Sequence, residues 1–175
     1  ILENIEVSPI KNMGRMGIST SMLKFNNTKV HKKYLLGKEN EGFYYAMEGF
    51  NTARILVAAS CIGAAESVLE EGINYIKNRK AFGQPIGKFE GIQFPLADLY
   101  SKLEATRLLV YKSAWIYDKM RKNLIDKSQV IKYSAMSKLL APELAIEVIS
   151  EVMKWFGAYG YTKEAGIEKA LRGVY

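Results

Sequence analysis

Cysteine and histidine are almost absent from this chain, which holds one of each among its 175 residues. The single cysteine, Cys61, excludes a disulfide within the chain, and His31 has no second histidine or cysteine nearby with which to form a zinc site. We therefore expect no metal site and no nucleophile built from a cysteine and a histidine. Cys61 lies among alanine and isoleucine residues, which predicts a small, buried, apolar side chain.

Long uncharged apolar runs are also absent. The longest lies between Arg54 and Glu66, which is shorter than the roughly 20 residues of a membrane-spanning helix. The first residues lack the charged and then apolar layout of a signal peptide. The composition, 49% apolar and 25% charged, is typical of a globular protein. These observations predict a cytoplasmic protein without a membrane span.

The net charge of +7 favours an anionic partner, although many basic residues are scattered beside acidic ones. No recognised DNA- or RNA-binding motif occurs, and the aromatic residues do not interleave with a basic stripe. We therefore expect no nucleic acid partner, and the phosphates of a nucleotide cofactor match these charges better. The chain has neither G-x-G-x-x-G nor a Walker loop, so such a cofactor must be bound in another way.

The first 36 residues differ from the rest of the chain. Residues 22–36 alternate apolar and polar side chains in the manner of a strand, and Gly14, Gly17 and the pair Asn26-Asn27 mark turns. Strands without sheet partners in the chain would leave edges unpaired. We therefore expect residues 1–36 to be the end of a β-domain whose other strands are missing.

From Gly42 onward the pattern is helical. The segment 42–78 is apolar on every side at its middle, which predicts a buried helix. A second helix is expected over 92–121, and a third begins after a cap at Asp126 or Ser128, with Pro142 expected to kink or restart it. A break at 155–161 precedes a last, polar helical start. The predicted fold is mainly α, an antiparallel up-and-down four-helix bundle whose last helix is truncated.

The connector at residues 75–93, YIKNRKAFGQPIGKFEGIQ, holds four helix breakers between 83 and 91. Arg79 and Phe82 stand at its start, where a guanidinium can bind phosphate oxygens and an aromatic face can lie against a heterocycle. A structural interpretation is also open. Basic side chains favour a helix C-terminus for dipole reasons, and Phe82 could be a core residue.

Several motifs together resemble the acyl-CoA dehydrogenase family, in matching order and spacing over nearly the whole chain. They are Leu35-Leu36-Gly37, Gly42-Phe43, Arg54 and the segments 79–86, 89–93, 96–98 and 154–161. The resemblance implies an enzyme with an N-terminal helical domain, a middle β-domain and a C-terminal four-helix bundle. Residues 1–36 would then be the C-terminal remnant of the middle β-domain and residues 37–175 the helical bundle domain.

The resemblance also implies FAD as the cofactor, with its ADP part reached by the bundle of a neighbouring subunit. Arg79 would contact the pyrophosphate and Phe82 would pack near the adenosine. The same pocket would include Glu90, Lys154, Trp155, Phe156, Gly157 and Ala158. The acyl-CoA channel would be lined by Phe50, Asn51 and Arg54, although an ordinary ion pair is an equally open role for Arg54.

The chain departs from the family pattern at four positions. Glu90 and Lys154 replace two glutamines, Ala158 replaces a glycine, and Gly173 stands where an aspartate is common. We hypothesise that Glu90 and Lys154 form an ion pair within the bundle, across a subunit interface or near the cofactor. Weakened or altered flavin binding is the alternative.

The family reaction removes the α-proton of an acyl-CoA with a glutamate and transfers the β-hydride to FAD. The glutamate usually follows the arginine matched by Arg172, beyond the last residue of this chain. In a minority branch it precedes the helix arginine, where this chain has Ala53. Glu48, Glu66 and Glu70 match neither place and are expected to be structural. No catalytic residue is therefore assigned, and the 175-residue chain alone is expected to be inactive.

The leading interpretation is a fragment of an FAD-dependent acyl-CoA dehydrogenase. Its implied partners are an acyl-CoA substrate, an electron-transfer flavoprotein or similar acceptor, and further copies of the chain in a homodimer or homotetramer. Alternatives are an acyl-CoA oxidase or flavin monooxygenase of the same fold, a non-catalytic helical interaction module derived from it, and an unrelated helical bundle.

Overall fold

The computed structural model describes residues 4–175 and divides into two compact units. The first ends at Gly49 and the second runs from Phe50 to Tyr175. The division falls inside the helix α1 (Gly42–Asn78). The domain boundary between residues 36 and 37 stays a prediction.

The first unit is built on an antiparallel hairpin of β1 (Ile5–Ile10) and β2 (Thr20–Phe25), with Ile5 opposite Phe25. The strand pattern therefore ends earlier than the predicted residue 36. Asn27 has a φ of +51°, which starts a turn, and a 3₁₀ helix, η1 (Lys32–Tyr34), follows. The His31 Nδ1 accepts a hydrogen bond from the Lys33 backbone N–H at 3.1 Å, so this histidine caps η1.

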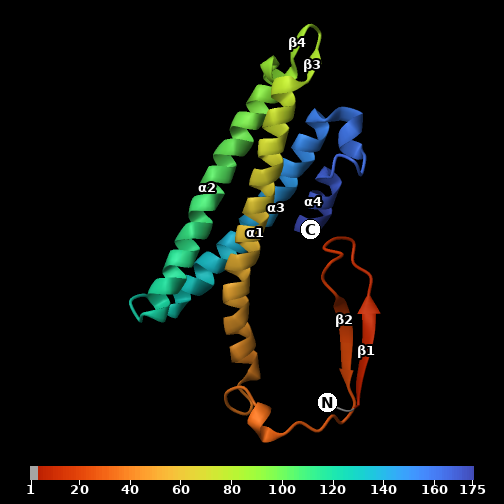
Figure 1. Cartoon of the computed structure of the whole chain (residues 1–175). Coiled ribbons are helices and arrows are strands. Elements are labelled where there is room, and N and C mark those ends of the chain that lie inside the picture. The colour runs from red at the N-terminus through yellow and green to blue at the C-terminus, as the bar shows by residue number, and fades with distance from the viewer. Residues whose placement is uncertain (1–3) are drawn as a thin grey trace. The chain divides into compact units, whose positions relative to one another are not determined.

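The second unit consists of helices that run alternately up and down (Figure 1). After α1 come α2 (Glu90–Arg121), α3 (Lys127–Trp155) and α4 (Ile167–Val174), which packs against α3. Two-residue strands, β3 (Lys80–Ala81) and β4 (Gln84–Pro85), and the 3₁₀ helix η2 (Ile86–Lys88) join α1 to α2. A third 3₁₀ helix, η3 (Gly157–Tyr161), precedes α4. The mainly α, antiparallel helical architecture is confirmed.

The start of α3 follows the prediction, whereas no second helix begins at its middle. The Asp126 carboxylate accepts a hydrogen bond from the Ser128 backbone N–H at 2.8 Å and caps the helix. Of the two alternatives predicted at Pro142, the restart is wrong, because α3 continues through this residue to Trp155, and the kink stays a prediction. Ala141 and Ala145 on either side are fully buried. Core packing therefore compensates for the backbone hydrogen bond that the proline lacks.

The core lies between α1, α2 and α3 and is rich in small side chains, which let the helices approach closely. Cys61 is 1% exposed, as predicted for a buried apolar residue. The residues with the lowest exposure include Ala58, Ala65, Leu69, Leu99, Leu103, Ala141, Ala145, Val148, Ile149 and Val152.

By length and composition α1 could cross a membrane, and it is the one such helix among residues 4–175. Its apolar residues from Ile55 to Ile76 supply one side of the core of the second unit. Burial against α2 and α3 accounts for only part of its hydropathy, since 39% of its most apolar window is buried and Leu56 is 63% exposed. The prediction of a helix buried on every side at its middle is therefore wrong: one face of α1 is buried and the other is exposed.

Buried hydroxyl groups join α2 to α3. The Ser113 and Ser137 Oγ atoms lie 2.7 Å apart, and Ser113 Oγ also lies 3.0 Å from the Tyr133 carbonyl oxygen. Ser134 is fully buried on the same side of α3. No side-chain nitrogen or oxygen buried among the described residues lacks a hydrogen-bond partner, so these polar groups carry no desolvation penalty from missing contacts.

Two glycines of α1 provide a matched test of this packing. A Cβ at Gly72 would lie 2.8 Å from Val152 Cγ1 and 3.1 Å from Trp155 Cε3, whereas a Cβ at the exposed Gly63 would meet nothing within 4 Å. We expect Gly72→Ala to lower the free energy of unfolding by about 1–3 kcal/mol through overpacking. Gly63→Ala should raise it by about 0.5–1 kcal/mol, because alanine favours a helix. Urea unfolding followed by circular dichroism measures both, and equal effects would contradict this packing.

Candidate functional site

The connector between α1 and α2 forms a tight hairpin. β3 and β4 pair Ala81 with Gln84, and the two-residue loop Phe82-Gly83 has φ values of +52° and +82°. Positive φ at both central residues indicates a type I′ turn, which asparagine and glycine favour and phenylalanine does not. The Phe82 side chain is 95% exposed and meets the Phe89 ring edge-on at 6.2 Å between centroids. Phe82 is therefore not a core residue.

Arg79 is fixed at the base of this hairpin by its backbone. Its N–H donates to the Tyr75 carbonyl at 2.8 Å, and its carbonyl accepts from the Ile86 N–H at 2.8 Å. The side chain is exposed, and no ion pair involves it within residues 4–175. The Arg79 guanidinium is therefore available to an anion while its backbone is held in place.

The end of α3 provides the second predicted segment, residues 154–158. Trp155 and Phe156 are each 6% exposed, and the Phe156 ring stacks on Tyr75 at 4.0 Å. Their side chains thus belong to the core, which limits any contact with a cofactor to the backbone. Gly157 has a φ of +60° and open space where a Cβ would stand, and Ala158 is exposed.

Tyr75 was not among the predicted site residues, yet it joins the two segments. Tyr75 lies in the last turn of α1, four residues before Arg79. Its ring stacks on Phe156, and this contact holds the end of α3 against the end of α1. The β3–β4 hairpin and the end of α3 consequently lie toward the same end of the bundle (Figure 1). In the sequence, the available signal was an aromatic residue near the end of the predicted helix 42–78, before the glycines and proline of the connector.

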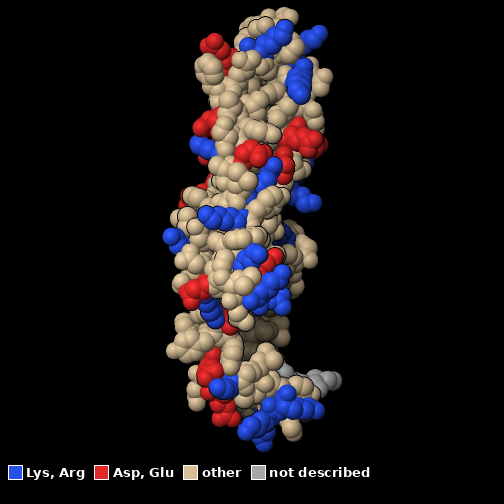
Figure 2. Space-filling model, turned by 90° about the vertical axis from the view of Figure 1, so that its left-hand side faces the viewer, with Lys and Arg blue, Asp and Glu red and all other residues tan. Residues whose placement is uncertain are grey.

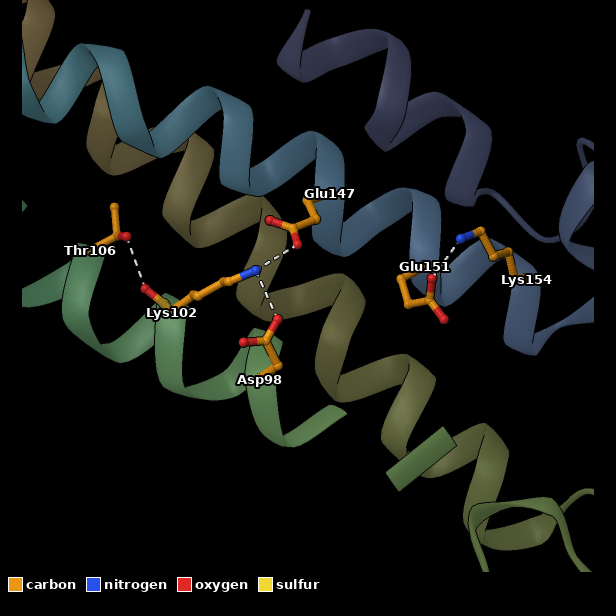
Figure 3. Close-up of polar contacts among 6 residues, drawn as sticks. All are labelled: Asp98, Lys102, Thr106, Glu147, Glu151 and Lys154. Carbon is orange, nitrogen blue, oxygen red and sulfur yellow. Dashed lines mark hydrogen bonds and ion pairs between the residues drawn. The ribbon is translucent and has the colours of Figure 1, made fainter. Parts of the chain in front are cut away.

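The hypothesised ion pair between Glu90 and Lys154 does not form within the described part of the chain. The Lys154 Nζ instead lies 2.7 Å from Glu151 Oε2 (Figure 3). Glu90 is the first residue of α2, and Lys154 is in the last turn of α3. Each charge therefore complements the dipole of its own helix. A pairing across a subunit interface stays a prediction.

A lysine bridge connects α2 to α3 next to this segment. Lys102 Nζ lies 2.7 Å from Asp98 Oδ2 and 2.8 Å from Glu147 Oε1 (Figure 3). The hydrogen bonds to Asp98 and then Glu147 raise the pKa of Lys102 above its usual range. The Thr106 Oγ1 donates to the Lys102 carbonyl at 2.8 Å. This bridge reaches α3 at Glu147, about one turn before Glu151 and two turns before Lys154.

The residues predicted to line the acyl-CoA channel lie on α1. Asn51 is 6% exposed, and its Oδ1 accepts a hydrogen bond from Arg54 Nη1 at 2.7 Å. A pocket of about 240 Å³ is lined by Phe50, Ala53, Arg54, Val57 and Lys138. The alternative role for Arg54 is not observed, because no acidic residue within residues 4–175 forms an ion pair with it.

Acidic residues of the second unit are mostly engaged in structural contacts. Glu66 Oε1 lies 2.6 Å from Arg107 Nη2, and this ion pair joins α1 to α2. Within α2, Glu104 Oε1 lies 2.9 Å from Arg107 Nη1. A structural role for Glu66 is thus confirmed. Figure 2 shows acidic and basic side chains interspersed over the face that carries α2. Among residues 4–175 no group of histidine, cysteine and acidic side chains is arranged to bind a metal ion.

The strained conformation of Phe82 is testable through stability. Asparagine tolerates positive φ better than phenylalanine, so we expect Phe82→Asn to raise the free energy of unfolding by about 1 kcal/mol. Phe82→Leu keeps a branched apolar side chain in the same conformation and should leave stability near that of the wild type. Thermal unfolding of both variants measures this difference. Destabilisation by Phe82→Asn would mean that the aromatic ring supports the fold.

Residues 40–175 match the family model described as acyl-CoA dehydrogenase, C-terminal domain. The chain is 40% identical to 3-(aryl)acrylate reductase of Clostridium sporogenes over 95% of its own length and 42% of the relative. It is 38% identical to the caffeyl-CoA reductase-Etf complex subunit CarC of Acetobacterium woodii, over 91% of the chain and 40% of that protein. Butyryl-CoA dehydrogenase from Megasphaera elsdenii superposes with a TM-score of 0.89 at 34% identity, covering 98% and 43% of the two chains. The chain thus spans about two fifths of the length of these relatives, and it belongs to the acyl-CoA dehydrogenase family.

Proposed function

We propose that the full-length protein containing this chain is an FAD-dependent acyl-CoA dehydrogenase that interconverts acyl-CoA and trans-2-enoyl-CoA thioesters. The observation that carries the proposal is the Phe82-Gly83 turn. An aromatic side chain is held there almost fully exposed, in a conformation that it disfavours, beside an unpaired arginine. Strain of this kind persists where a functional contact requires it, and family membership supplies the function.

The residues at this end of the bundle fit the ADP part of FAD. The Arg79 guanidinium suits a pyrophosphate, and the exposed Phe82 ring suits an adenine face. Gly157 allows a close approach of backbone N–H groups. Glu90 is unfavourable to a pyrophosphate, so its carboxylate must lie away from the phosphates. Bound FAD would supply hydride acceptance from the substrate β-carbon.

The chain's own contribution to the reaction is binding and orientation. Phe50 and Arg54 border a pocket into which the acyl-CoA substrate is proposed to extend. Ala53, which stands at one possible position of the catalytic base, cannot accept a proton. The carboxylate that abstracts the α-proton is therefore not assigned to any residue of this chain.

We also propose a homo-oligomer, a dimer or tetramer, in which the Phe82 hairpin reaches the FAD of a neighbouring subunit. Exposed apolar side chains on α2 support a subunit interface, namely Leu108, Tyr111 and Trp115, at 66%, 65% and 55% exposure.

An electron-transfer flavoprotein or similar protein is the proposed redox partner, in view of the Etf complex of the relative CarC. A cytoplasmic location is proposed from composition alone.

The direction of the reaction is open to a second proposal. Two of the three similar proteins given above are named reductases, whereas the third is named butyryl-CoA dehydrogenase. In the reductive direction a hydride adds to the β-carbon and a proton to the α-carbon of the enoyl thioester, at the expense of a reduced electron-transfer protein. The same site geometry serves both directions, since a catalyst accelerates a reaction and its reverse.

FAD binding is the first test of this proposal. The purified full-length protein should show flavin absorbance, and Arg79→Gln should weaken FAD binding about tenfold or more through loss of a charge-assisted contact. Lys77→Gln, an exposed basic residue in the last turn of α1, is the matched control and should leave binding unchanged. Absence of flavin from the wild-type protein would favour a non-catalytic interaction module.

Reactivity of the loaded protein separates the enzymatic alternatives. Anaerobic addition of a saturated acyl-CoA should bleach the flavin absorbance, and the reduced protein should reoxidise slowly in air. Rapid consumption of oxygen would instead indicate an acyl-CoA oxidase or a flavin monooxygenase. A protein that reduces enoyl-CoA with a chemical electron donor, but is not bleached by acyl-CoA, would support the reductive direction.

A further inference from the structure

We infer that Lys138 is a second cationic contact for the thioester substrate, which acts with Arg54 on one anionic oxygen group. The inference rests on the proposed function, because the ligand is the proposed acyl-CoA substrate. Phe50, Arg54 and Val57 of α1 and Lys138 of α3 line the same pocket of about 240 Å³. Lys138 lies 84 positions after Arg54 in the sequence, so only the folded bundle brings the two cations together.

The charge of this pocket is uncompensated. Its lining contains Arg54 and Lys138 but no carboxylate. Neither cation forms an ion pair within residues 4–175, whereas Lys102 and Arg107 of the same unit each pair with two carboxylates. Two cations that share a pocket repel one another unless an anion lies between them. The pocket is therefore suited to a phosphate or a carboxylate.

The pocket is also pre-organised on rigid elements. Arg54 is held by the hydrogen bond to Asn51, whose side chain is itself buried. Lys138 follows Ser137, which is fully buried and bonded to Ser113 of α2. Helical backbones on both sides thus set the positions from which the cations reach the pocket. The hydrogen-bonded Arg54 loses less conformational entropy when a ligand binds, whereas the exposed Lys138 side chain becomes ordered at that point.

Apolar side chains make up the rest of the lining. Phe50 and Val57 stand beside the two cations, so the ligand that matches this pocket carries an anionic group next to an apolar segment. An acyl-CoA offers two such groups. One is a phosphate of coenzyme A next to its dimethyl-bearing arm, and the other is a carboxylate on the acyl chain. Both would present charged oxygens to the same pair of side chains.

Lys138→Met in the full-length protein tests the inference. We expect the Kd for an acyl-CoA whose acyl chain ends in a carboxylate, and which therefore carries both anionic groups, to rise about tenfold from loss of one charge-assisted contact, as measured by isothermal titration calorimetry. KM should rise in parallel with kcat unchanged, because the contact is the same in the ground and transition states. Lys138→Arg should retain most of the affinity. Lys132→Met removes an exposed lysine of α3 outside the pocket and should behave as the wild type.

Two further ligands identify the anionic group. If a coenzyme A phosphate occupies the pocket, Lys138→Met will not weaken binding of the corresponding acyl-pantetheine, which has no phosphates. If an acyl carboxylate occupies it, the variant will weaken binding only of thioesters with a terminal carboxylate. Arg54→Met combined with Lys138→Met should then lose less affinity than the product of the single effects, because both contact one group.

Two outcomes would overturn the inference, and they differ in what they say of the proposed function. If the wild-type protein binds and converts acyl-CoA while Lys138→Met and Lys132→Met have equal Kd values for every thioester, only the role of Lys138 is contradicted. If wild-type protein binds no acyl-CoA at all, the role of Lys138 and the proposed function fall together.

Discussion

The close contact between α1 and the end of α3 at Gly72 is the constraint on which the candidate cofactor site depends. A side chain at this position would collide with Val152 and Trp155, so only glycine allows the two helices to meet there. One turn further along α1, Tyr75 stacks on Phe156. The Phe82 hairpin follows directly after α1, and the break at Gly157 follows directly after Phe156. The contacts at Gly72 and Tyr75 thus determine where the Phe82 hairpin and the segment after Phe156 lie.

The helices and their order could be predicted from apolar periodicity and breakers, because these features are local. The Asp126 cap and the burial of Cys61 followed in the same way. The continuation of α3 through Pro142, where a restart was one of the two predicted alternatives, has a tertiary cause. Burial of Ala141 and Ala145 against the core outweighs the local preference of proline to end a helix. A window of sequence does not contain that competing free energy.

The candidate site was predictable in its chemistry but not in its orientation. Residue type and order identified Phe82 and Arg79, yet left open whether Phe82 was a core residue, since an aromatic ring suits either environment. Trp155 and Phe156 match the family segment by position, but their side chains point into the core. Sequence resemblance aligns backbones, whereas the direction of a side chain depends on its packing partners. For Phe156 that partner is Tyr75, which lies outside the family motifs.

Glu90 and Lys154, the two charged replacements, change which side chains can contact an anion at the candidate site, and Arg79 becomes the more available cation. Glu90 at the start of α2 and Lys154 at the end of α3 are each stabilised by a helix dipole, so neither needs the other as a partner. Lys154 is further neutralised by Glu151, which leaves it less able to attract a pyrophosphate. Arg79 at the base of the hairpin is exposed and forms no ion pair within residues 4–175. Under the proposed binding of FAD, its guanidinium is therefore better placed than the compensated Lys154 to contact a pyrophosphate.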